Sequence, residues 1–152
     1  MTDAPSARVV IIDDEAEVCD LLGKVLMREG YDVHTAQTGE AGLALIEAQP
    51  PVCLVVDKLL PSLGGLEVAA QVRQRWPKVA IVLVTAHPEP FTLDTERPDA
   101  VLAKPFKNLE VVVTAVREAI EAQRTAKGPL TNLKERVAAV VAEITPGRRK
   151  RE

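Results

Sequence analysis

The chain has 152 residues, of which 47% are hydrophobic and 27% are charged, and its formal net charge is −3. This length and composition predict one globular domain with a substantial core plus an appendage, and they exclude two domains of ordinary size. No apolar run reaches membrane-spanning length and the first residues lack a signal-peptide pattern, so we expect a cytoplasmic protein with a disordered N-terminus over residues 1–7. Seven Lys and Arg against three Glu give residues 127–152 a charge of +4, which leaves −7 for residues 1–126.

Strands and helices are predicted to alternate strictly along residues 8–85. "RVVIID" (8–13) is typical of a buried strand, and the apolar residues after it recur at spacings of three and four, which predicts a helix over 15–29. Cys19 and Cys53 lie inside apolar patterns, so we expect them to be small buried side chains. The alternation predicts a parallel sheet covered by helices on both faces. Further strands are expected over 31–36, 52–57 and 79–85, further helices over 39–49 and 66–76, and the stripe of the first helix is Val18, Leu21, Leu22, Val25 and Leu26.

The alternation is interrupted after Thr85. Pro88, Pro90 and Pro98 disfavour a regular helix of normal length, and a strand over 99–103 and a helix over 107–124 follow. A break at 127–130 precedes one further predicted helix over about 131–144 and a basic tail. We therefore expect a domain over 8–125 and a C-terminal extension over 126–152. The stripe of the last helix consists of Leu133, Val137, Val140, Val141 and Ile144.

Polar residues stand where the predicted strands end. The first strand ends in Asp13 and Asp14, the third in Asp57 and the fourth in Thr85, and the fifth leads into Lys104. The carboxyl ends of parallel strands meet at one edge of an open sheet, which is where ligands bind. We therefore expect three carboxylates, one hydroxyl and one ammonium group to converge there.

Three clustered carboxylates repel one another and require a positive charge. Mg²⁺ prefers oxygen ligands, is commonly held by one or two carboxylates, and leaves positions for water and phosphate oxygens. A carboxylate can itself be the nucleophile of phosphoryl transfer and form an aspartyl phosphate. Asp57 is the best candidate because it ends a central strand.

Each of these residues has a simpler interpretation when it is taken alone. An Asp at a strand end is most often a turn or helix-cap residue, and Asp13 and Asp14 could merely cap the first helix. Thr85 could be an ordinary strand residue and Lys104 a solvated charge. The joint placement at four carboxyl ends is what favours a functional site.

Four stretches of the sequence also resemble a known family. "VVIIDDEAEV", "VVDKLLPSLGGLEV", "VLVTAH" and "LAKPF" are similar, in order and spacing, to the motifs of the response-regulator receiver domain of two-component signalling. The resemblance covers about residues 7–124. It implies a flavodoxin-like, doubly wound, five-stranded parallel sheet. It also implies that a histidine kinase or a histidine phosphotransfer protein donates a phosphoryl group to Asp57.

The same resemblance implies a role for each site residue. Asp14, Asp57 and the backbone carbonyl of Leu59 would ligate Mg²⁺, and Asp13 would act mainly through a bound water. Thr85 would hydrogen-bond the phosphoryl group and Lys104 would pair with it. In this family the peptide bond of the Lys104-Pro105 dipeptide is typically cis.

Some positions depart from the family pattern. Val101 stands where the family usually has a Tyr or Phe that swings inward on activation, and Lys58 directly after the nucleophile is uncommon. The three prolines fall where the family has its fourth helix, so we expect that helix to be short or missing. The phosphorylation chemistry is therefore expected to be intact, whereas the ordinary readout is not.

Two other functions are alternatives to a phosphorylated receiver. A pseudo-receiver, which is an interaction module that works without phosphorylation, is favoured by the altered fourth-helix region. An aspartyl-nucleophile phosphatase needs a second Asp two residues after the nucleophile, where this chain has Leu59. We therefore expect a signalling protein without a separate catalytic output.

The length and the apolar stripe of the C-terminal extension indicate which partners to expect. One helix after Lys127 is too little for a helix-turn-helix, so no DNA-binding domain is predicted. Its apolar stripe must be covered by the domain or by a second chain, and we favour a second chain, which would give a homodimer. The downstream protein partner and the pathway are not indicated by the sequence.

Overall fold

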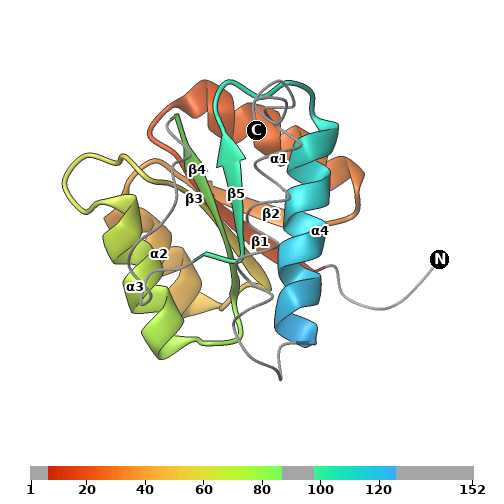
Figure 1. Ribbon diagram of the computed structural model, residues 1–152. Helices are drawn as coiled ribbons and strands as arrows, with labels where there is room; N and C mark the ends of the chain where they lie inside the picture. The colour runs from red at the N-terminus through yellow and green to blue at the C-terminus, as the bar shows by residue number, and fades with distance from the viewer. Residues whose placement is uncertain (1–6, 87–97, 126–152) are drawn as a thin grey trace, which may run out of the picture.

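The computed structural model describes residues 7–86 and 98–125, which form a five-stranded parallel sheet between two layers of helices (Figure 1). The strand order β2-β1-β3-β4-β5 confirms the predicted flavodoxin-like, doubly wound fold. The expectations for residues 1–6, for a short or missing fourth helix over 87–97 and for a helix over 131–144 fall outside the described residues. In chain order the elements are β1 (Arg8–Ile12), α1 (Ala16–Arg28), β2 (Asp32–Ala36), α2 (Gly39–Ala48), β3 (Cys53–Asp57), α3 (Gly65–Arg75), β4 (Ala80–Thr85), β5 (Ala100–Ala103) and α4 (Glu110–Arg124).

The two faces of the sheet are buried by different helices. Along β1, Val9 and Ile11 face a core shared with α1 and α4, whereas Val10 and Ile12 face a second core shared with α2 and α3. This division follows from the period of two in a strand, which sends successive side chains to opposite faces. Figure 1 shows the same arrangement, with α1 and α4 on one side of the sheet and α2 and α3 on the other. Strands β1, β3, β4 and β5 are apolar at nearly every position because both faces are covered, whereas the edge strand β2 is partly exposed and carries Asp32, His34 and Thr35.

Local signals set the ends of the helices. Thr38 caps α2, because its side-chain oxygen accepts a hydrogen bond from the Ala41 N–H at 3.0 Å. The helix predicted from residue 107 begins at Glu110 instead, since the Asn108 side chain accepts the N–H groups of Glu110 and Val111. After α1, Gly30 adopts φ 95°, a conformation that glycine reaches without steric cost, and this agrees with its predicted role at the end of that helix.

One member of the predicted stripe of α1 is wrong. Leu21 is 41% exposed, whereas Cys19 is buried in the core beside Leu22 and Leu26. The inward face of α1 therefore includes Cys19 in place of Leu21, so it is turned slightly toward Cys19 relative to the predicted stripe. The prediction that Cys19 and Cys53 are buried small side chains is confirmed: both are free thiols, and burial raises the pKa of each.

None of the helices in the described ranges is both long enough and apolar enough to cross a bilayer. This finding agrees with the sequence, where charged residues interrupt every apolar run.

A buried carboxylate forms hydrogen bonds with three elements at the amino edge of the sheet, which is the edge where the strands begin. Asp99 is 6% exposed and accepts a hydrogen bond from the Ile81 N–H at 2.8 Å. Arg73 of α3 donates to the same carboxylate at 3.3 Å, and so does the Gln123 side chain of α4 at 3.3 Å. Asp99 therefore connects β4 with one helix from each layer, a role that the sequence analysis did not foresee.

We expect Asp99→Ala to lower the free energy of unfolding by about 1–3 kcal/mol, because the buried Ile81 N–H and the Arg73 guanidinium lose a shared acceptor. Urea unfolding followed by circular dichroism measures this difference. Asp20→Ala on the exposed surface of α1 removes the same side chain as a control and should change stability little. Equal stability of the Asp99→Ala variant and the wild type would contradict the structural role of this carboxylate.

Candidate functional site at the carboxyl edge of the sheet

The register of the strands brings the predicted site residues to one edge. Ile12 pairs with Val56 and Asp57 with Val84, so Asp13 and Asp57 end neighbouring strands. Thr85 pairs with Ala103, and its backbone carbonyl accepts the Lys104 N–H at 2.9 Å. The parallel arrangement thus places carboxylates, hydroxyl and ammonium at the carboxyl ends of four strands.

Three carboxylates form a compact cluster. One carboxylate oxygen from each of Asp13, Asp14 and Asp57 lies within 4.8 Å of the others. Asp13 is 1% exposed and Asp57 is 6% exposed, whereas Asp14 faces solvent. Two of these charges are therefore held in a poorly hydrated position, where an uncompensated carboxylate is costly.

Lys104 supplies a positive charge to this cluster. Its Nζ donates a hydrogen bond to Asp57 Oδ2 at 3.1 Å and lies 3.1 Å from Asp13 Oδ2. Burial lowers the pKa of Lys104, but the pairing with Asp57 and Asp13 outweighs it, so that the net pKa is raised. The ammonium group is thus held in its charged form between the two buried carboxylates.

Asp13 is the least satisfied member of the cluster. Burial raises the pKa of this carboxyl group, although its Oδ1 accepts a hydrogen bond from the Glu15 N–H at 2.9 Å. Among the described residues, no donor makes a hydrogen bond to the buried Asp13 Oδ2, even though Lys104 lies at ion-pair distance. A buried carboxylate oxygen without a hydrogen bond needs a further positive partner. The three-oxygen cluster therefore fits a hard divalent cation in its donor type and charge.

The loop after β3 fixes the Asp57 side chain. The Leu59 N–H donates to Asp57 Oδ1 at 3.1 Å, and the Lys58 N–H donates to the Val84 carbonyl at 2.8 Å. Gly65 closes this loop, because its N–H donates to the Lys58 carbonyl at 3.0 Å. A Cβ atom at Gly65 would collide with the Asp57 carbonyl oxygen. Only glycine allows the first turn of α3 to approach the end of β3 this closely.

The structure thus brings together all the residues that the sequence singled out. Asp13, Asp14 and Asp57 form one carboxylate cluster, Lys104 pairs with Asp13 and Asp57, and Thr85 is 3% exposed beside Lys104. Leu59 lies next to Asp57 with an exposed side chain, and its carbonyl remains a predicted ligand. The Lys104-Pro105 bond is cis, as the resemblance implied.

Glu15 was missed by the sequence analysis. Its Oε1 lies 3.7 Å from Lys104 Nζ, and its side chain is 62% exposed. Its position in the sequence could have indicated a place in the site, because Glu15 directly follows Asp13 and Asp14 after β1. An ion pair this exposed contributes little to stability, although it adds negative charge at the mouth of the site.

Comparisons with known proteins agree with this fold. The family model described as "Response regulator receiver domain" matches residues 9–117. The alkaline phosphatase synthesis transcriptional regulatory protein PhoP of Bacillus subtilis (strain 168) is 39% identical over 107 residues, which are 68% of this chain and 45% of that protein. The chain therefore spans less than half the length of this curated relative.

Two solved structures illustrate the likeness of the fold. A putative response regulator from Chloroflexus aurantiacus J-10-fl gives a TM-score of 0.68 at 29% identity, covering 76% of this chain and 98% of that one. A CheY-like response regulator receiver domain protein from Methanospirillum hungatei JF-1 gives a TM-score of 0.69 at 26% identity, covering 78% and 97% of the two chains. The fold and the acidic edge of the sheet are those of a receiver module of two-component signalling. This chain belongs to the response-regulator receiver domain family.

We expect Gly65→Ala to lower the free energy of unfolding by about 1–3 kcal/mol, because the new methyl group displaces the Asp57 backbone. Gly64→Ala is a matched control: it adds the same methyl group one residue earlier, in open space at φ −70°. Its effect should stay within about 1 kcal/mol. Urea unfolding of both variants measures the difference, and equal effects would show that the close approach of Gly65 to Asp57 is not required.

Proposed function

We propose that this chain accepts a phosphoryl group on Asp57 from a histidine kinase or a histidine phosphotransfer protein, and that it signals through protein–protein contacts. The observation that supports this proposal is the buried Asp57 carboxylate, held 3.1 Å from Lys104 Nζ beside two further carboxylates. Membership of the receiver family supports the same chemistry. In this proposal the chain takes part in phosphoryl transfer only at its own Asp57.

In the proposed reaction, an oxygen of Asp57 forms the new bond to phosphorus. The phosphorus–nitrogen bond of the donor phosphohistidine breaks, and its electron pair stays on the imidazole nitrogen, which takes up a proton. The product is an acyl phosphate on Asp57 and a neutral histidine. The Leu59 N–H and Lys104 hold the attacking carboxylate in one orientation, so that little entropy is lost on reaching the reactive geometry.

The cation in this proposal is Mg²⁺, held by Asp13, Asp14, Asp57 and the backbone carbonyl of Leu59. When bound, it neutralises negative charge on phosphoryl oxygens. The unsatisfied Asp13 Oδ2 and the three clustered carboxylates support this assignment.

Lys104 and Thr85 would act on the transferred group. The Lys104 ammonium stays charged because of its two carboxylate neighbours, and it can move its hydrogen bonds to a phosphoryl oxygen. Thr85 lies beside it at the end of β4, where its hydroxyl can donate to another phosphoryl oxygen. Both residues would stabilise charge without entering the covalent step.

The alternative is a pseudo-receiver that works without phosphorylation. Val101 is 1% exposed within β5, at the position where the family usually has an aromatic residue, so the ordinary moving part is replaced by a β-branched side chain. The complete set of site residues favours a phosphorylated receiver over this alternative. The name of the Bacillus relative refers to transcription. The match spans only 45% of that protein, so we assign no DNA-binding function to this chain from it.

We expect the chain to gain the mass of one phosphoryl group when it is incubated with Mg²⁺ and a small-molecule phosphodonor such as acetyl phosphate. Intact-mass spectrometry measures this gain, which should disappear in the Asp57→Asn variant and in excess chelator, because both remove an essential part of the acidic site. Asp20→Asn makes the same change on the exposed surface of α1 and should label as the wild type does. Equal labelling of the Asp57→Asn variant would show that the nucleophile is a different residue.

We also expect phosphorylation to change the face formed by β5 and α4 only slightly, because Val101 fills its buried position and has no ring to swing. Backbone amide chemical shifts with and without a phosphoryl mimic measure this response. The changes should centre on the loops after β3 and β4, next to Asp57 and Thr85. Large changes confined to residues 99–120 would show instead that the ordinary switch operates despite Val101.

A further inference from the structure

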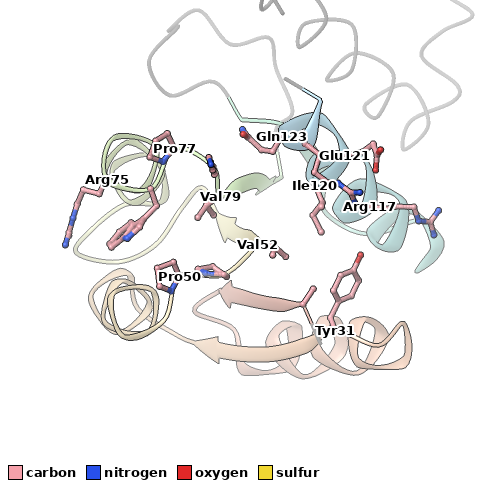
Figure 2. A pocket seen from close by; sticks show the side chains of 15 residues that line it. Tyr31, Pro50, Val52, Arg75, Pro77, Val79, Arg117, Ile120, Glu121 and Gln123 are labelled. Carbon is pink, nitrogen blue, oxygen red and sulfur yellow. The ribbon is translucent and has the colours of Figure 1, made fainter. Parts of the chain in front are cut away.

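A groove lies at the amino edge of the sheet, at the opposite end of the strands from Asp57. It has a volume of about 940 Å³. The segment before β3, the turn after α3 and the last turns of α4 form its walls (Figure 2). Neither the site described above nor the proposed phosphoryl transfer uses this groove.

The groove is largely apolar although it is open to solvent. Val52 is 39% exposed, and Tyr31, Trp76 and Ile120 are only partly buried. Figure 2 shows Val52, which directly precedes β3, and Ile120 of α4 on either side of the same space. Apolar side chains gathered in one concave surface indicate a place where another apolar segment binds.

The chain supplies such a segment close to the groove. Arg124 is the last residue of α4 and itself lines the groove, and residues 126–152 begin two residues later. Within them, residues 131–144 carry the aliphatic stripe that the sequence analysis identified, at the spacing of one helical face. A segment tethered this close has a high effective concentration at the groove, so its docking costs little translational entropy.

The charges that line the groove favour one part of the extension as the segment that binds there. Four cations, Arg75, Lys78, Arg117 and Arg124, and one carboxylate, Glu121, line the groove, so its lining is positive overall. Arg75 is already paired with Glu47 and lies over the Trp76 ring. The basic run at 148–151 would be repelled by these charges. Residues 131–144 contain two basic and two acidic residues and are neutral overall, so their apolar stripe can approach without this penalty.

We propose that the aliphatic stripe of residues 131–144 docks into the groove between α3, β3 and α4 of the same chain, and not on the second chain that the sequence alone favoured. The extension then covers Val52, Trp76 and Ile120 and leaves the Asp57 edge open to a phosphodonor protein. The basic run follows the docked segment and projects a positive charge from the amino edge of an otherwise acidic domain. This inference does not depend on phosphorylation of Asp57.

Trp76 reports on the groove, because it lines the groove and is the chain's single tryptophan. In the full chain we compare Val140→Asp with Ala139→Asp: both add one negative charge, but Val140 belongs to the stripe and Ala139 falls on the opposite face of the predicted helix. Val140→Asp should shift Trp76 emission to the red and increase its quenching by acrylamide. Ala139→Asp should leave both unchanged.

A second variant tests the contact itself. Val52→Asp changes the floor of the groove, and it should lower the melting temperature of the full chain, as Val140→Asp does. Because both changes disrupt one contact, the double variant should melt no lower than the more affected single variant. Additive losses would overturn the proposal.

The remaining outcomes also decide the proposal. Unchanged Trp76 emission in the Val140→Asp variant would mean that the stripe does not occupy the groove. Equal red shifts in the Val140→Asp and Ala139→Asp variants would mean that charge alone perturbs Trp76. Emission that depends on protein concentration, together with a dimer mass in light scattering, would assign the groove to the extension of a second copy and overturn docking within one chain.

Discussion

The site depends on one positive charge placed between two buried carboxylates. Lys104 Nζ lies 3.1 Å from both Asp13 Oδ2 and Asp57 Oδ2. Without this charge, two poorly hydrated carboxylates on neighbouring strands would repel each other. The geometry follows from the sheet, because the register of β1, β3, β4 and β5 decides which side chains meet. The parallel sheet therefore gathers negative charge at one edge, and Lys104, which directly follows β5, supplies the compensating positive charge.

Buried carboxylates at the two edges of the sheet differ in how fully they are hydrogen-bonded. At the amino edge, Asp99 accepts hydrogen bonds from a backbone N–H and from the side chains of two helices, so its oxygens are well satisfied. At the carboxyl edge, Asp13 has a buried oxygen that receives no hydrogen bond within the described ranges, and burial raises the pKa of its carboxyl group. A satisfied carboxylate stabilises the fold, whereas an unsatisfied one is typical of a site that expects a ligand. The same residue type thus has a structural role at one end of the sheet and a proposed functional role at the other.

The sequence predicted the fold and the site more completely than it predicted side-chain contacts. The alternation of apolar strands with amphipathic helices was enough for the sheet, and the polar residues at the strand ends were enough to locate Asp13, Asp57 and Lys104. Leu21 was placed wrongly because a helical stripe allows more than one inward face, and packing against the sheet decides between them. Asp99 could not be recognised, since its partners lie 18 to 26 residues away in the chain. The groove could not be foreseen either, because three segments form it and none of them has a distinctive pattern alone.

Helix α4 connects the edge that carries the acidic cluster with the groove at the opposite edge. It begins near the Lys104 loop and ends at the groove, and a helix of its 15 residues is about 22 Å long. Figure 1 shows it running alongside the sheet from one edge to the other. Coupling between Asp57 and the extension would need an element with two alternative arrangements, and rigid packing alone does not provide one. Because Val101 fills its buried position in β5 and has no ring to swing, a signal from Asp57 would pass through the loops after β3 and β4 rather than through a shift of α4.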